Sequence, residues 1–489
     1  MTGKTITAIA LGLFATLSLP LSGCGDNRGT SSPDASITVE GLYPSFEPGQ
    51  TQYVARCGSR AAGIRIEASH ETSVSIDSTA RRTGVIKAEP DVRPGEDFEI
   101  AVTGHDGRHT SYRVRCLPTD FPRWRFQQLR PVNPGLFVVA FRPTQDARPW
   151  VIVFDHQGVP RWWYSPDTRA LWGQVLKDGT IAWARSLGDG YGSDPRMAYE
   201  VRSPSGELVR VVKTKGSIID GHEFQELENG NVLVDSYAPA GRVDLKRFGG
   251  PARTSAVFAE IQEIDPAGRV IWRWNSHRHI HFSETRRWWN NVLSNGKAGV
   301  GGATTFDPVH LNSIEPRETD ELVISTRHTD AIYGIARPTG DIRWKLGGTH
   351  TDESLRVIGD PARKRFGGQH DARIAPDGSL TVYDNGKDRP RRPRVVSYRL
   401  DPDRGTATYL GQLNDSRITT SHCCGSARPL IEGGWLVSWG DNPLVTGFDS
   451  DGQAAFRLEL PTSTFRAVPV PEGATSVATL DRGMEAMER

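Results

Sequence analysis

A short turn recurs six times from about residue 135 onward and constrains the fold more than any other feature. Each turn begins at Asp, Ser or Pro, ends at Gly, and is followed by a strand-like segment that often carries Trp. The turns lie at residues 155–158, 203–206, 265–268, 338–340, 401–405 and 449–452. A supersecondary unit repeated at this period is typical of β-propeller blades. The sequence therefore predicts an all-β fold with a six-bladed propeller over residues 121–489, interrupted by one helical insertion at 282–293 that carries Trp288 and Trp289.

Residues 35–120 show a different pattern, in which polar and apolar residues alternate in short runs broken by Gly, Pro, Asp and Asn. This pattern predicts a small antiparallel β-sandwich domain. Cys57 and Cys116 lie near its two ends, and we predict that they form a disulfide. The segment 41–53 resembles cadherin-like sandwich domains of bacterial surface proteins, which usually bind or act as spacers.

The first residues predict the compartment of the protein. Lys4 precedes an apolar run at 6–21 that is followed by Ser22, Gly23 and Cys24. This is the pattern of a lipoprotein signal peptide over 1–23, with Cys24 as the lipidated residue and a flexible tether at 24–34. A plain signal peptide cut elsewhere is the alternative. We therefore expect an exported protein that is anchored by lipid to a bacterial membrane and faces the periplasm or the cell surface.

The charges argue against one class of partner. The chain has 59 Lys and Arg against 58 Asp and Glu, so it has no strongly basic surface to attract nucleic acid. We therefore expect no nucleic-acid partner, whereas the sequence leaves a homodimer open.

Three histidines occupy equivalent positions when the blades are aligned on the turn of their first hairpin. The alignment uses Gly179, Gly230, Gly378, Gly434 and Gly473, with the segment 318–321 serving as the turn in the remaining blade. Counting back from each turn to the start of the innermost strand reaches Leu171, His222, His310, His370, Ser426 and Phe465. Innermost strands line the channel of a propeller, so equivalent residues are neighbours in space. We therefore predict that His222, His310 and His370 face one another at one mouth of the channel.

The second strands return to the same mouth and predict further site residues. The count reaches Tyr237 and Asn385, which we expect to contact substrate, and Arg327, which should lie beside His310. Arginine next to converging histidines indicates an anion site, because its planar guanidinium pairs with two oxygens of a sulfate or phosphate. The same fixed cation argues against a metal ion there. His328 is expected to point away from the site and to serve packing.

Two other groups have more than one interpretation. His277, His279 and His281 alternate along one segment and could suggest a metal site, although they lack a carboxylate or Cys partner at a recognised spacing. Cys423 and Cys424 are adjacent, so they form either a strained vicinal disulfide or a pair of free thiols.

At these residues the sequence resembles the bacterial arylsulfotransferase family, in a divergent form. The segments that carry the resemblance are 220–231 (DGHEFQELENGN), 307–315 (DPVHLNSIE), 324–332 (ISTRHTDAI), 339–348 (TGDIRWKLGG) and 366–371 (FGGQHD). The resemblance implies a six-bladed propeller with a small β-sandwich, and no cofactor or metal. It also implies aryl sulfate and phenol as substrates.

The implied reaction is a ping-pong transfer without a nucleotide sulfate donor. His370 would attack the aryl sulfate and carry the sulfuryl group, while Arg327, His222 and His310 would stabilise the sulfuryl oxygens and protonate the leaving phenolate. Two alternatives remain open at this point: an anion- or glycan-binding surface propeller without activity, and an aryl sulfatase.

Overall fold

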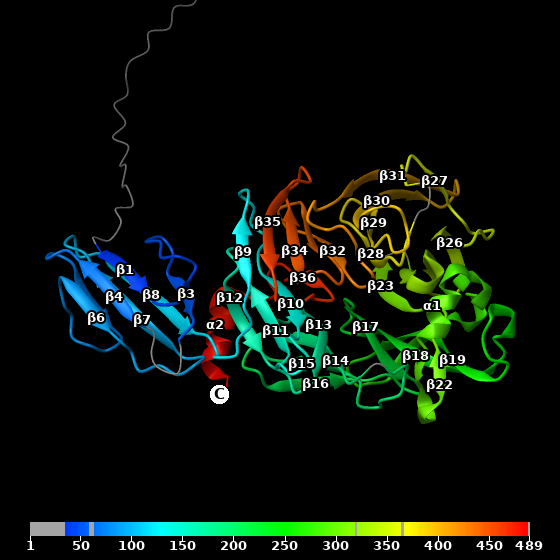
Figure 1. Cartoon of the computed structure of the whole chain (residues 1–489), viewed down its shortest axis with the longest axis horizontal. Helices are drawn as coiled ribbons and strands as arrows, with labels where there is room; N and C mark the ends of the chain where they lie inside the picture. The colour runs from blue at the N-terminus through cyan, green and yellow to red at the C-terminus, as the bar shows by residue number, and fades with distance from the viewer. Residues whose placement is uncertain (1–34, 58–62, 189, 318–319, 363–365, 488–489) are drawn as a thin grey trace, which may run out of the picture.

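The computed structural model describes residues 35–57, 63–188, 190–317, 320–362 and 366–487. The fold is all-β, as predicted, and two regions lie side by side along the long axis of the molecule (Figure 1). The predicted signal peptide, Cys24 and the tether lie outside the described residues. No helix in the described part is both long and apolar enough to cross a membrane.

The N-terminal region consists of two sheets that share one core. One sheet contains β1 (Ala35–Val39), β4 (Ile64–Ala68) and β6 (Val85–Ala88), and the other contains β2 (Leu42–Tyr43), β3 (Gln52–Ala55), β5 (Ser73–Ile76), β7 (Asp97–Thr103) and β8 (His109–Cys116). Alternate residues of both sheets, such as Ile66 and Ile100, are buried against one another. Cys57 and Cys116 form a disulfide at the edge of this core, with their Cα atoms 5.3 Å apart. The strand pairs of this region are antiparallel, as predicted, except that β3 pairs in parallel with β8.

In the described residues from 125 onward, the main strands form six sheets. The first three sheets contain β36 (Ala467–Pro469) with β10 (Phe137–Phe141), β11 (Trp150–Phe154) and β12 (Pro160–Tyr164); β13 (Arg169–Val175), β14 (Ile181–Ser186), β15 (Tyr199–Arg202) and β16 (Leu208–Val212); and β17 (Ile218–Glu226), β18 (Val232–Val243), β19 (Thr254–Ile264), β20 (Val270–Asn275), β21 (Lys297–Ala298) and β22 (Thr304–Phe306). The other three contain β23 (Leu311–Arg317), β24 (Glu321–Thr326), β25 (Ala331–Ala336) and β26 (Ile342–Gly347); β27 (Arg356–Ile358), β28 (His370–Ile374), β29 (Leu380–Asp384), β30 (Arg394–Asp401) and β31 (Thr406–Leu413); and β32 (Ser426–Pro429), β33 (Trp435–Ser438), β34 (Leu444–Phe448), β35 (Ala454–Glu459) and β9 (Arg125–Gln128).

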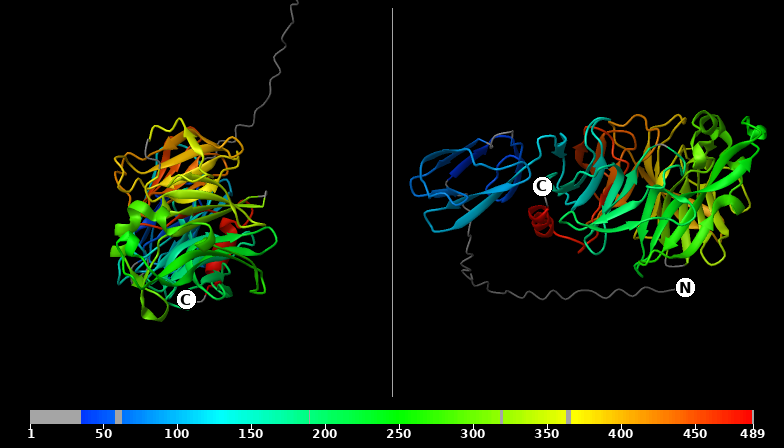
Figure 2. Two further views of the ribbon diagram at one scale, coloured as in Figure 1. Left: turned by 90° about the vertical axis from the view of Figure 1, so that its right-hand side faces the viewer. Right: turned by 90° about the horizontal axis from the view of Figure 1, so that it is seen from below.

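The sheets contact one another in a closed circuit, which is the arrangement of a β-propeller (Figure 1). Seen from below, the N-terminal region again lies beside the propeller (Figure 2). Each of the six recurring turns joins adjacent antiparallel strands of one sheet. The chain ends close the circuit twice, because β36 pairs with β10 and β9 pairs with β35. The neighbour of β36 therefore comes from the start of the propeller region, so the expectation of a hairpin at Gly473 is wrong.

Large aromatic side chains fill the spaces between sheets. The Trp162 Nε1–H donates to the carbonyl of Pro204 at 2.7 Å, and the Trp274 Nε1–H donates to the carbonyl of Gly340 at 2.9 Å, each in the next sheet. Both rings are buried. Burying a ring of this size stabilises the sheet contact, and the paired N–H group avoids the cost of an unsatisfied donor.

Helical segments are few and short. The predicted insertion contains η3 (Phe282–Trp288) and α1 (Trp289–Ser294), and the other short turns are η1 (Lys246–Phe248), η2 (Ser276–Arg278), η4 (Val300–Gly302) and η5 (Arg327–Thr329). The sequence analysis missed α2 (Val477–Ala486), which Ser476 caps at its N-terminus. This helix lies between the two regions, and its Asp481 pairs with the buried Arg115 of β8.

Candidate active site in the propeller channel

A cavity of about 360 Å³ lies at one mouth of the channel and contains the three predicted histidines. His222 lies within β17, His310 directly precedes β23, and His370 begins β28. All three line this cavity together with Tyr237. The rings of His222 and His310 lie edge to face with their centroids 4.9 Å apart. The equivalence of the three positions, read from the repeat, thus corresponds to real proximity.

His370 is held in one orientation by backbone groups. Its Nδ1 lies 3.0 Å from the carbonyl oxygen of Gly368, so Nδ1–H is the donor and Nε2 keeps its lone pair. The Cys424 N–H lies 3.2 Å from this Nε2 and donates to it. Burial, followed by the positive charges of Arg327, His222 and His310, holds the pKa of His370 well below its ordinary value. The ring is therefore neutral at neutral pH, with a nitrogen lone pair that a nucleophile requires.

His222 and His310 each hold a carboxylate on Nδ1. The Asp220 carboxylate lies 2.7 Å from Nδ1 of His222, and the Asp307 carboxylate lies 2.6 Å from Nδ1 of His310. His310 has a left-handed backbone, with φ of 58°, and its N–H also bonds Asp307. In both residues the pairing fixes the proton on Nδ1, and Nε2 is the ring nitrogen available to the cavity.

Two buried carboxyl groups behind His222 differ from ordinary aspartates. Burial raises the pKa of Asp220 to about 7, and burial together with the charge of Asp220 raises the pKa of Asp235 well above its usual range. Burial also lowers the pKa of His222. The group therefore exchanges a proton near neutral pH, which suits acid and base work on a phenol.

Arg327 lies beside His310, as predicted, and its N–H donates to the His310 carbonyl at 2.8 Å. Its guanidinium bonds the His422 carbonyl at 3.0 Å and lies over the Trp288 ring, with Cζ 4.3 Å from the ring centroid. It pairs with no carboxylate within the described residues, and its buried Nε has no hydrogen-bond partner. Such a cation can bind an anion without first breaking an ion pair.

The expectation that His328 points away from the site is wrong. Its Nε2 lies 2.6 Å from a guanidinium nitrogen of Arg327 and accepts from it, while Nδ1–H donates to the Asp307 carbonyl at 2.7 Å. Its ring stacks on His310 with centroids 4.8 Å apart. The short turn η5 directs consecutive side chains to the same side, whereas the prediction assumed a continuing strand in which they alternate. His328 therefore orients Arg327.

The two predicted substrate contacts lie in different places. Tyr237 lines the cavity, whereas Asn385 is buried behind it and is not among the lining residues. The Asn385 amide donates to the carbonyls of Gly368 and Cys424 at 2.7 and 3.1 Å. Asn385 thus fixes the two backbone segments that hold His370, and a substrate contact by either residue stays a prediction.

Cys423 and Cys424 are free thiols that line the same cavity, with their sulfur atoms 2.6 Å apart. The hydrogen bond between them lowers the pKa of Cys423 and raises that of Cys424. The sequence left a vicinal disulfide and a pair of free thiols as alternatives, and the structure contains the free thiols.

A layer of buried charges supports the histidines from below, and the sequence analysis missed it. Glu223 bonds Arg373 and Arg466, and Asp371 bonds Arg373 and Arg428, all of them buried or nearly so. The signal in the sequence was an acidic residue directly after two of the three channel histidines. Each buried charge in this layer has an opposite partner, which a buried charge requires.

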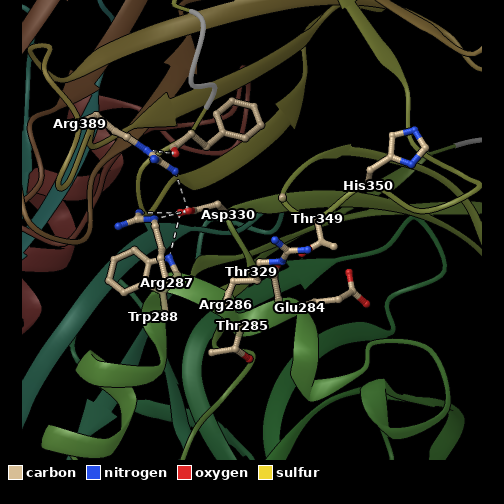
Figure 3. Close-up of a pocket in the computed structure, with 12 residues that line it drawn as sticks. Glu284, Thr285, Arg286, Arg287, Trp288, Thr329, Asp330, Thr349, His350 and Arg389 are labelled. Atoms are coloured by element: carbon tan, nitrogen blue, oxygen red, sulfur yellow. Dashed lines mark hydrogen bonds and ion pairs between the residues drawn. The ribbon is translucent and has the colours of Figure 1, made fainter. Parts of the chain in front are cut away.

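A second cavity, of about 530 Å³, is lined by Trp288, Asp330 and Arg389 (Figure 3). Here Asp330 accepts hydrogen bonds from Arg287, Arg389 and the Trp288 Nε1–H. Asp330 also accepts from the Gly368 N–H at 2.9 Å, next to the carbonyl that holds His370. The insertion thus connects to the channel through one carboxylate and one tryptophan.

The three alternating histidines of the segment 277–281 have structural partners. The His277 ring packs on Phe258, the His279 ring stacks on Trp274, and His281 caps the start of η3. They do not form a metal-binding group within the described chain. Two groups there have suitable geometry, namely Asp307 with His310 and His328, and Asp220 with His222 and Asp235. Hydrogen bonds between these same side chains and the backbone already account for both groups.

Comparisons with known proteins agree with the site. The Arylsulfotransferase (ASST) family matches residues 174–460. The arylsulfate sulfotransferase AssT of Escherichia coli O6:H1 (strain CFT073) is 22% identical over 330 residues, which are 56% of this chain and 54% of that protein. AssT of Lelliottia amnigena is 23% identical over 332 residues, with the same coverage. The chain thus spans about half the length of the curated relatives it matches.

Solved structures give only distant likeness. A protein of unknown function from Bacteroides caccae covers 69% of this chain and all of its own length, with 13% identity and a TM-score of 0.42. The β-propeller domain of Cps50 (Swd1) from Myceliophteria thermophila covers 71% of this chain and 90% of its own length, with 11% identity and a TM-score of 0.35. The family match spans more than half of the chain and includes every channel histidine, so the chain belongs to the arylsulfotransferase family.

Proposed function

We propose that this protein is an aryl-sulfate sulfotransferase that moves a sulfuryl group from a phenolic sulfate ester to a phenol through a sulfohistidine at His370. The observation that carries the proposal is the state of His370. Its Nδ1–H is fixed on Gly368, its Nε2 lone pair adjoins the cavity, and its pKa is low enough to keep the ring neutral. A nitrogen nucleophile needs all three properties.

In the first step, the Nε2 lone pair of His370 attacks the sulfur of the aryl sulfate. The bond between sulfur and the aryl oxygen breaks, and its electron pair leaves with the phenolate. The sulfuryl group remains on Nε2, and the Nδ1–H bond to the Gly368 carbonyl stabilises the positive charge on the ring. The hydrogen bond from the Cys424 N–H to Nε2 is long, at 3.2 Å, so breaking it adds little to the activation free energy of the attack.

Arg327 and the other two histidines stabilise the charges that develop during the transfer. The guanidinium of Arg327 lies beside His310 and pairs with the sulfuryl oxygens, because no carboxylate of the described chain competes for it. A proton on Nε2 of His310 passes to the leaving phenolate, and the Asp307 carboxylate on the opposite ring nitrogen stabilises the charged form of that imidazole. His222, whose pKa burial lowers, stays neutral and shares the proton on its Nδ1 with Asp220.

The second step is the reverse of the first with a new phenol. The acceptor gives its proton to the histidine that lost one, its oxygen attacks sulfur, and the bond between sulfur and Nε2 breaks. The electron pair of the broken bond returns to Nε2 of His370, so the two steps balance without an oxidant, a nucleotide or a metal. The proposal includes export and a lipid anchor at Cys24, on the strength of the N-terminal pattern.

Intact mass spectrometry after brief exposure to para-nitrophenyl sulfate tests the proposal. We expect the wild type to gain one sulfuryl group and to release para-nitrophenol, and His370→Asn to do neither. His281→Asn, on the outer insertion, is the matched control and should behave as the wild type does. Phenol release that does not accelerate when an acceptor phenol is added would assign an aryl sulfatase instead. Neither adduct nor release by the wild type would leave an anion-binding propeller.

A further inference from the structure

The channel cavity has a roof that is made by two loops far apart in the sequence. The loop between β14 and β15 contributes Tyr191, whose N–H donates to the carbonyl of Ala298 in β21 at 2.9 Å. Gly190 allows this approach, because a Cβ at that position would lie 2.8 Å from the same carbonyl oxygen. Residues of both segments, Tyr191 and Lys297, therefore line the same cavity as His370.

Aromatic and apolar side chains form the wall under this roof. The rings of Tyr191 and Tyr237 lie edge to face with centroids 5.4 Å apart, and Leu171, Met197 and Phe465 line the same cavity. Its volume, about 360 Å³, falls in the range of ~300–1,000 Å³ found for small-molecule sites. The space beside the sulfuryl site thus fits an aromatic ring.

Two cations at this cavity have no acidic partner among the residues that the structure describes. Lys297, from β21, lies with Nζ 5.5 Å from the Tyr191 ring centroid, and Arg169, at the start of β13, also lines the cavity. Neither forms an ion pair within the described residues. The acidic residues that line the cavity are already engaged, because Asp194 binds Arg196 and Asp220 binds His222. The rim therefore carries a surplus of positive charge.

The sulfuryl group does not account for this surplus. Under the proposed function, its oxygens are met by Arg327, next to His310, and by the histidines that line the cavity, whereas Lys297 lies over the ring of Tyr191. A cation next to an aromatic wall pairs with an anionic substituent on the ring that the wall binds. We propose that the preferred substrates are aromatic acids, in which the phenol ring carries a second anionic group such as a carboxylate, and that Lys297 and Arg169 select them. This inference rests on the proposed function.

Two acceptors of the same ring system test the inference, namely para-hydroxybenzoate and its uncharged methyl ester. The quantity measured is the ratio of kcat/KM for the acid to kcat/KM for the ester, with saturating para-nitrophenyl sulfate as donor. We expect the wild type to prefer the acid. Lys297→Met and Arg169→Met should each lower the ratio by roughly fivefold, between the effects of an exposed ion pair and of a buried bond to a charged group.

The control variant is Lys177→Met, because Lys177 is exposed and pairs with Glu228 away from the cavity. Its ratio should equal that of the wild type, and Lys297→Glu should lower the ratio further than Lys297→Met does. An unchanged ratio in Lys297→Met, or an equal loss with both acceptors and in the release of para-nitrophenol, would overturn the inference. In those cases the cations act on the donor sulfate or not at all. Absence of any turnover by the wild type would instead contradict the proposed function.

Discussion

The two faces of Trp288 carry arginines with opposite roles. Arg327 lies over the ring on the channel side, with Cζ 4.3 Å from the centroid, and Arg287 lies over it at 4.2 Å on the side of the second cavity. Arg287 shares the Asp330 carboxylate with Arg389 (Figure 3), whereas Arg327 has only a histidine nitrogen and a carbonyl oxygen. The same residue type on the same ring is thus neutralised on one side and left uncompensated on the other.

The difference shows where the fold prepares a place for an anion. Burial lowers the pKa of Arg327, which means that the surroundings disfavour its charge and that a bound anion relieves the cost. The pair of arginines at Asp330 has its counter-charge already and holds the insertion in place. The presence of a carboxylate partner therefore marks an arginine as a structural contact, and the lack of one marks it as part of an anion site.

The largest expected effect comes from exchanging Arg327. We expect Arg327→Met to lower kcat/KM for aryl sulfate by about 10²–10³, the loss found when one group that stabilises developing charge is removed. Its free energy of unfolding should stay equal or rise, because an uncompensated buried charge is removed. The comparison uses steady-state kinetics and chemical denaturation side by side.

Arg287→Met is the matched variant on the other face of Trp288. Removing this arginine leaves Arg389 to neutralise Asp330, so we expect the free energy of unfolding to fall by about 1–2 kcal/mol. The effect on kcat/KM should be much smaller than that of Arg327→Met. Equal kinetic losses in the two variants would contradict the assignment of opposite roles.

Asp330→Asn should give the next largest effect, because it removes the carboxylate that Arg389 pairs with and leaves Arg287 only the exposed Asp388. We expect a loss of about 2–4 kcal/mol in the free energy of unfolding. A second effect follows from the bond of Gly368 N–H to Asp330, since the Gly368 carbonyl fixes Nδ1–H of His370.

A loosened Gly368 should let the His370 ring populate both neutral forms, with the proton on either nitrogen. Nitrogen-15 NMR of labelled histidine reports this distribution without any need for turnover. Asp388→Asn, at an exposed carboxylate that also contacts Arg287, is the control and should leave the His370 spectrum unchanged. An unaltered spectrum in Asp330→Asn would confine Asp330 to a structural role.

The repeat made the histidine cluster of the channel predictable, whereas the residues that depart from the repeat could not be predicted. His222, His310 and His370 were found because propeller symmetry turns equivalence in sequence into proximity. His328 was misjudged, because the short turn η5 replaces the alternation of a strand with consecutive side chains on one side. No periodicity could have predicted Asp330, which reaches Trp288 across 42 residues and Gly368 across 38.

The ends of the chain were also difficult to predict. The sequence shows strand-like segments at the start and end of the propeller, but their pairing across the closure depends on three-dimensional order. The helix α2 lies outside the repeat from which the blades were predicted. Its contacts with Arg115 and Trp163 come from distant parts of the chain.

Trp288 itself should give a moderate effect that depends on the replacement. Trp288→Phe keeps an aromatic face for both arginines and loses the bond to Asp330, whereas Trp288→Leu loses both. A cation over an aromatic face contributes about 0.5–2 kcal/mol, so we expect Trp288→Leu to raise KM for the donor by roughly tenfold and Trp288→Phe to raise it less. Equal KM values in the two variants would show that the ring does not hold Arg327.

The smallest expected effect is on the pH dependence of the free energy of unfolding, and it tests how His328 orients Arg327. Burial, with the charges of His310 and Arg327, holds the pKa of His328 well below its ordinary value, so His328 is neutral in the folded protein. In the unfolded chain it gains a proton below about pH 6.5. The unfolded state then binds more protons, and the free energy of unfolding falls as the pH drops through that value, by up to ~1.4 kcal/mol per pH unit for this group.

Asp220 acts in the opposite direction over the same range, because its pKa is raised to about 7 by burial and the folded state keeps its proton. The informative quantity is therefore the difference between His328→Gln and the wild type, measured by chemical denaturation between pH 5.5 and pH 7.5, about one unit to either side of the ordinary histidine pKa. We expect the variant to lose less stability on acidification than the wild type does. A parallel decline in the two proteins would mean that His328 carries a proton in the folded state. In that case it could not accept the hydrogen bond from Arg327, and the orientation of that arginine would have to depend on Trp288 and the His422 carbonyl alone.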